Sequence, residues 1–184
     1  MKLREIYLRW RHSKGYGVHS PYAFRFINDV VRPGNYGYYA YDNLEQYSRG
    51  ESIESRWFFK DARFIIRLSV FLKTKRIVTL GKRIGEARIA AKALKITYYN
   101  CESPESLTLK PGDLLIIYTG REEYREVIHR AIEKEVAIYA VSPCREIEEV
   151  IEKPIEHGVL FEGKTKLILI PRKEMEYVSY SVKF

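Results

Sequence analysis

The chain has 184 residues, of which 46% are hydrophobic and 30% are charged, and its formal net charge is +8. This length suits one domain with a substantial core and excludes two large ones. No apolar run is long enough to span a membrane, and the first residues lack the apolar core of a signal peptide. Cys101 and Cys144 have no metal-binding spacing. We therefore expect a cytoplasmic protein with free thiols and no membrane partner.

The positive charge is concentrated in residues 1–20, which carry one acid, Glu5. A basic segment rich in aromatic residues is able to contact nucleic acid or an anionic surface, but it also fits a solvated helix end. No nucleic-acid-binding signature accompanies it, so we do not expect nucleic acid as a partner. The bases are Lys2, Arg4, Arg9, Arg11 and Lys14.

Residues 1–75 are predicted to form a helical extension packed on the core. Ser20 is a suitable N-cap and Pro21 a suitable first residue for a helix that ends at 32–34. A loop rich in tyrosine and glycine is expected at 34–43, and apolar residues recur at helical spacing over 57–72. The tyrosines either cover the core or line a ligand or partner surface; they are Tyr36, Tyr38, Tyr39, Tyr41 and Tyr47.

Residues 76–184 are predicted to form an α/β core. Short apolar runs alternate with helical patterns, which favours a parallel sheet of strands buried on both faces. A hairpin turning near 163–164 and a strictly alternating segment at 177–184 indicate an antiparallel C-terminal edge, which is suited to pairing in a homodimer. The expected strands are 76–80, 95–99, 113–118 and 136–141, and the expected helices are 86–94, 122–135 and 144–157.

Three segments carry a family resemblance: "HSKGYGVHSPYAFRFI", "RIVTLGKRIGEARIAAKAL" and "LILIPRKEMEYVSYSVKF". Together with the order of elements, they resemble the class I S-adenosylmethionine-dependent methyltransferase fold, and more narrowly O-methyltransferase-like proteins of the Bacteroidetes type. The resemblance implies a three-layer α/β sandwich, a Rossmann-like methyltransferase fold with a shortened, mostly parallel sheet. The connection between the strands at 95–99 and 113–118 is short and contains two prolines, so the third strand of that fold is expected to be missing.

The resemblance also implies a cofactor site that this sequence has altered. The cofactor is expected around Thr79, Gly81, Lys82, Gly85 and Asn100. Thr79 and Asn100 stand where the family has acidic residues, Lys82 and Arg83 stand where it has small ones, and the carboxylates needed for magnesium are absent. Alternatively, the glycines only allow the chain to pass from strand to helix. A further alternative is that Lys82 and Arg83, beside the helix N-terminus, bind an anion such as phosphate.

The sequence therefore favours a degenerate, non-catalytic methyltransferase-like protein that acts as a binding or interaction module, with S-adenosylmethionine binding lost and no metal. The alternative is a metal-independent S-adenosylmethionine-dependent methyltransferase acting on a small molecule, with Tyr118 or His19 as base. A third possibility is nucleic-acid or anion binding through the basic N-terminus, which predicts affinity that falls steeply with salt.

Overall fold

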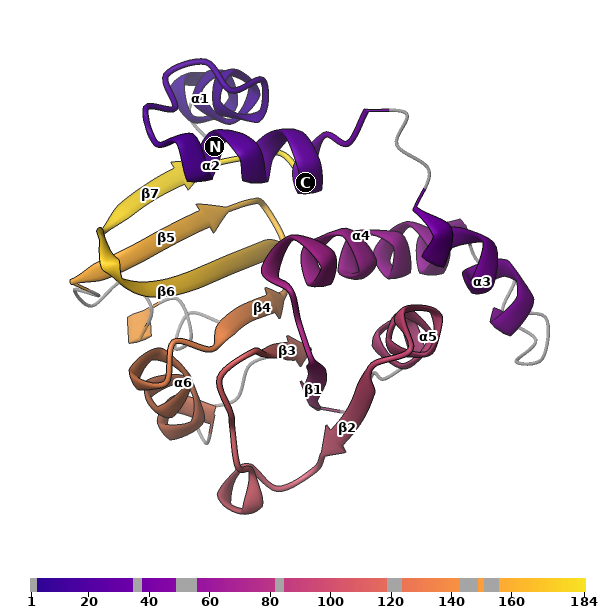
Figure 1. Ribbon diagram of the computed structural model, residues 1–184. Coiled ribbons are helices and arrows are strands. Elements are labelled where there is room, and N and C mark those ends of the chain that lie inside the picture. The colour runs from indigo at the N-terminus through magenta and orange to yellow at the C-terminus, as the bar shows by residue number, and fades with distance from the viewer. Residues whose placement is uncertain are drawn as a thin grey trace.

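The computed structural model describes residues 3–34, 38–48, 56–81, 85–118, 124–142, 149–150 and 156–184. Their strands form one seven-stranded sheet in the order β2-β1-β3-β4-β6-β5-β7. Figure 1 shows this sheet running through the molecule with helices on both sides. The strands are β1 (Arg76–Leu80), β2 (Thr97–Cys101), β3 (Asp113–Tyr118), β4 (Ala137–Val141), β5 (His157–Glu162), β6 (Lys166–Glu176) and β7 (Val178–Ser181).

The strand directions confirm a mostly parallel, mixed α/β sheet. β1 pairs in parallel with β2 and β3, and β3 pairs in parallel with β4. β6 is antiparallel to both β4 and β5. The predicted antiparallel edge needs correction, because β6 lies inside the sheet and the edge strand β7 pairs in parallel with β5. Since β6 already occupies one side of β5, the chain reverses after Glu176 and β7 takes the free side.

The helices largely follow the predicted pattern. Ser20 caps α2 as expected, since its Oγ accepts a hydrogen bond from the Ala23 amide at 3.3 Å. The predicted loop at 34–43 needs correction, because α3 begins at Tyr39, with Asp42 in its first turn, where a carboxylate favours the helix dipole. The helix predicted at 144–157 lies mostly outside the described residues. The described helices are α1 (Leu3–Ser13), α2 (Pro21–Phe26), the π-helix η1 (Ile27–Val31), α3 (Tyr39–Ser48), α4 (Arg56–Leu72), α5 (Gly85–Leu94), the 3₁₀ turn η3 (Pro104–Ser106) and α6 (Arg125–Glu133).

Successive strand residues face opposite sides of the sheet and build two separate cores. Ile77 belongs to the core covered by α2, α4 and α5, whereas Val78 belongs to the core covered by α6. In the first core Phe26 of α2 stacks on Phe161 of β5, with ring centroids 4.0 Å apart. The arrangement is a helix–sheet–helix sandwich, and α2, η1, α3 and α4 contribute to the same core as the sheet.

The first sheet edge differs from its prediction. The run at 95–99 was expected to be buried on both faces, but in β2 Thr97 and Tyr99 are exposed while Cys101 is buried. The reason is its position, because β2 ends the sheet and no helix among the described residues covers its α6-side face. The connection from β2 to β3 contains only η3 and is held by α6, since Arg130 donates hydrogen bonds to the carbonyls of Pro104 and Leu107.

The opposite edge of the sheet carries α1. The Ser13 hydroxyl at the end of α1 accepts a hydrogen bond from the Lys183 amide at 2.6 Å, which joins the first helix to the last segment of the chain. In Figure 1 α1 is the outermost element at this end of the molecule. Among the described helices, none combines the length and the apolar character needed to cross a membrane.

Candidate functional site

The candidate site lies where the parallel strands β1, β2 and β3 end. The chain goes from β1 to β2 on one side and then returns to β3 on the other side of β1. Such a reversal of strand order is where open α/β sheets bind ligands, at the carboxyl ends of the strands. Thr79 and Asn100 are paired in register at these ends of β1 and β2. The sequence-predicted positions are therefore brought together. We call Thr79, Gly81, Gly85, Tyr98 and Asn100 the strand-end site.

Thr79 is fully buried and its hydroxyl joins the other two polar residues of the strand-end site. Its Oγ1 donates to Asn100 Oδ1 at 2.8 Å and lies 2.9 Å from the Tyr98 hydroxyl. A carbonyl oxygen only accepts, so the single Thr79 proton goes to Asn100 and the Tyr98 hydroxyl is the donor to Thr79. The side chains at the two positions that the resemblance assigns to the cofactor thus bind each other.

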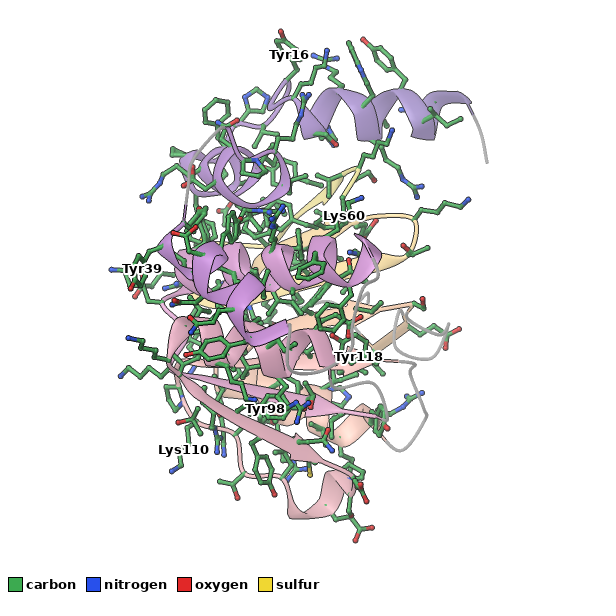
Figure 2. All side chains as sticks on the ribbon, turned by 90° about the vertical axis from the view of Figure 1, so that its right-hand side faces the viewer. Tyr16, Tyr39, Lys60, Tyr98, Lys110 and Tyr118 are labelled. Carbon is green, nitrogen blue, oxygen red and sulfur yellow. The ribbon has the colours of Figure 1, made fainter. Side chains whose placement is uncertain are left out.

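The protonation of Tyr98 agrees with this arrangement. Burial of the phenol raises the pKa of Tyr98 above its usual value of 10.0, although Thr79, which would donate to the deprotonated oxygen, and the charge of Arg88 on α5 act in the opposite direction. Tyr98 is therefore neutral at physiological pH and keeps its proton for donation. Figure 2 shows Tyr98 on the side of the molecule where β2 forms the edge of the sheet. The network consists of neutral hydrogen-bonding groups, none of which supplies a carboxylate.

Gly81, the first residue after β1, is required by the backbone. Its φ is +101°, and a Cβ at this position would lie 2.6 Å from the carbonyl oxygen of Tyr118 at the end of β3. Side chains rarely adopt this conformation, and no Cβ fits at that distance. The structural role considered for the glycine is thus sufficient to explain its presence.

The start of α5 is also occupied by neighbouring side chains. A Cβ on Gly85 would lie 3.0 Å from the ring of Phe58 on α4, so glycine allows the two helices to approach closely. Glu86, the second residue of α5, is 2% exposed. A carboxylate beside a helix N-terminus interacts favourably with the helix dipole and opposes binding of a further anion there. Lys82 and Arg83, the predicted anion-binding pair, lie outside the described residues.

The two residues considered as a base are placed differently. Tyr118 ends β3 beside Gly81 and is buried. His19 is exposed, and it precedes α2, which packs over β5 through Phe26. β5 is four strands from β1 in the sheet, so these two strands are about 19 Å apart at the usual strand spacing. His19 is therefore not brought to the strand-end site.

Two residues that shape the site were not predicted from the sequence. Tyr98 bonds to Thr79, and Phe58 packs against the first turn of α5. Tyr98 and Asn100 are two apart in a strand and so share a face, which is a signal that the sequence did contain. Phe58 lies within the apolar helical pattern predicted at 57–72, but only the tertiary contact between α4 and α5 places it at Gly85.

The described ranges contain no group of three or more His, Cys, Asp or Glu side chains able to hold a metal ion. No protein-family model matches the chain, and comparison with curated proteins finds no match.

Proposed function

We propose that the protein is a degenerate, non-catalytic methyltransferase-like protein that acts as a binding or interaction module. The observation that supports this proposal is the hydrogen bond between the side chains of Thr79 and Asn100. In the fold that the sequence resembles, these positions carry acids that hold the cofactor. Here the hydroxyl of a buried threonine donates its hydrogen bond to the neighbouring asparagine. Neither residue provides the negative charge that would pair with the cofactor's ammonium group.

The sheet supports the same proposal. Its order is compatible with the resembled fold after loss of the third strand, because β2 is an edge strand and the chain passes from it to β3 through η3 alone. A further strand beyond β2 would add protein surface beside Asn100 to enclose a ligand. Its loss leaves less protein surface to enclose a nucleoside.

One observation favours the alternative, a metal-independent methyltransferase acting on a small molecule. The strand order reverses between β1 and β3, and this is the usual ligand position in open α/β sheets. In that case Asn100, which is half-buried, would bind a ribose hydroxyl in place of Thr79.

Calorimetric titration with S-adenosylmethionine and S-adenosylhomocysteine separates the two functions. We expect no saturable heat of binding at millimolar ligand. Cooperative unfolding of the same protein checks that it is folded. Binding at micromolar strength that Asn100→Ala weakens about tenfold or more, as loss of a hydrogen bond to a ligand predicts, would contradict the proposal and favour the enzyme. Asn28→Ala is the matched control, because Asn28 is an exposed asparagine of η1, remote in sequence from both strands.

A further inference from the structure

The helix α1, the turn after it and the helix α2 present large apolar side chains to solvent. Ile6 is 46% exposed, Tyr7 54%, Trp10 49%, Tyr16 61% and Phe24 46%. Isolated apolar side chains on a surface are ordinary, but a contiguous group marks an interaction site. We call this group, together with the exposed bases beside it, the α1 surface; the bases are Arg4, Arg11 and Lys14.

Helical spacing places the members of α1 on one side. At 100° per residue, Ile6 and Trp10 lie in one row and Tyr7 and Arg11 in the adjacent row. The rings of Tyr7 and Trp10 stack with centroids 6.2 Å apart, and the Lys14 ammonium lies 4.2 Å from the Trp10 ring. An apolar row, Ile6 and Trp10, therefore runs along the exposed face beside a second row in which Tyr7 is followed by the base Arg11.

The turn that follows extends this face. A Cβ on Gly15 would lie 2.7 Å from the ring of Phe24, so the Phe24 ring lies directly against the turn. A Cβ on Gly17 would lie 3.7 Å from Arg11, which brings the turn beside the second row. Figure 2 shows Tyr16 at the outer end of the molecule, pointing away from the sheet. The α1 surface is thus continuous from α1 to the start of α2.

We propose that the α1 surface binds the surface of an anionic lipid bilayer, with α1 lying in the interfacial plane. Charge complementarity supports this partner, because Arg4, Arg11 and Lys14 are exposed beside the apolar row. The composition agrees as well, since tryptophan and tyrosine favour the boundary between lipid headgroups and acyl chains, and an aliphatic side chain inserts below it. The sequence predicts no membrane partner because it has no spanning segment, but an interfacial helix needs none.

Single-stranded nucleic acid is the competing partner, and the geometry disfavours it. Bases stack on aromatic faces that are free, whereas the Trp10 ring already contacts Lys14 and Tyr7. Ile6 offers no stacking surface. The α1 surface is also separate from the strand-end site, since α1 is joined to the segment after β7 and the strand-end site lies at β1 and β2, toward the other edge of the sheet.

The test uses the full chain with vesicles of phosphatidylcholine alone or of phosphatidylcholine with phosphatidylserine. Co-sedimentation should show binding only to the vesicles that contain phosphatidylserine. With Trp57→Phe as background, Trp10 is the only tryptophan, and its fluorescence should shift to shorter wavelength as the ring leaves water. Replacing Arg4, Arg11 and Lys14 together by Gln should lower the vesicle affinity about 100-fold, since each base near an anionic surface contributes about 1 kcal/mol.

The matched control replaces three exposed bases on other elements, Lys110, Lys164 and Lys173, by Gln. It removes the same charge, and the vesicle affinity should fall less than about threefold because screening confines the attraction to groups near the membrane. Ile6→Ser with Trp10→Ser should abolish the fluorescence shift and weaken binding, and circular dichroism checks that each variant is folded. The proposal is overturned by failure to bind anionic vesicles, by equal loss in the two triple variants, or by binding to single-stranded oligonucleotide without binding to vesicles.

Discussion

Gly81→Ala is the substitution whose cost follows most directly from the structure. Gly81 leaves β1 with a φ of +101°, and the added Cβ would lie 2.6 Å from the Tyr118 carbonyl oxygen. That oxygen belongs to the main chain of β3, whose six residues are all buried. The clash therefore cannot be relieved by rotating a flexible side chain.

The expected loss of stability in Gly81→Ala has two parts. A strained backbone conformation costs about 1–3 kcal/mol, and forcing an extra carbon into a packed region costs about 1–3 kcal/mol. We expect the free energy of unfolding to fall by about 4 kcal/mol, which is a large part of the 5–15 kcal/mol typical of a domain. For a chain of this length the melting temperature should fall by about 12 °C.

Thermal and urea unfolding followed by circular dichroism measure this change. Gly85→Ala is the matched control, because it lies in the same strand-to-helix connection, but its nearest neighbour is the movable Phe58 ring and its φ is not positive. Alanine is also the better helix former, so the control should change the stability by about 1 kcal/mol or less. Equal stability of Gly81→Ala and the wild type would refute the close approach of β1 and β3.

Three further substitutions test the packing around the site and the core. Thr79→Val keeps the shape but removes hydrogen bonds of 2.8 and 2.9 Å, so chemical denaturation should show a loss of about 1–2 kcal/mol; a more stable variant would contradict the network. Tyr98 has a raised pKa, so its contribution to stability is complete below pH 10.0 and is lost as the pH rises through the folded-state value. Tyr98→Phe should therefore lose less stability than the wild type between neutral and strongly alkaline pH, and parallel pH profiles would count against a raised pKa. Phe26→Ala removes a ring stacked 4.0 Å from Phe161 and should cost about 3–5 kcal/mol in urea unfolding, whereas a cost below about 1 kcal/mol would show that α2 does not pack on β5.

Much of the fold could be predicted because local patterns determine it. The apolar runs that became β1, β3 and β4 are short and buried on both faces. The apolar pattern at 57–72 likewise predicted α4, whose Ile65 and Leu68 are buried. The cap at Ser20 followed from residue type alone. These features depend on neighbours along the chain, which a sequence displays directly.

The features that were missed depend on neighbours across the sheet. The alternation at 177–184 identifies a strand but not its direction, so the parallel pairing of β7 with β5 could not be deduced from it. The sequence likewise placed Thr79 and Asn100 at the ends of two strands. Only the register of β1 with β2 shows that the two side chains bind each other and that Tyr98 completes the network.

Our proposal is that Thr79, Tyr98 and Asn100 bind one another and that the strand-end site retains no cofactor-binding function. An amide-resolved magnetic resonance titration with S-adenosylhomocysteine tests this proposal by following the backbone amide of Gly81 and the side-chain amide of Asn100. We expect neither signal to move at millimolar ligand. Saturable shifts of both signals, with no shift of the Asn28 side-chain amide, would contradict it and place a ligand where β1 and β2 end.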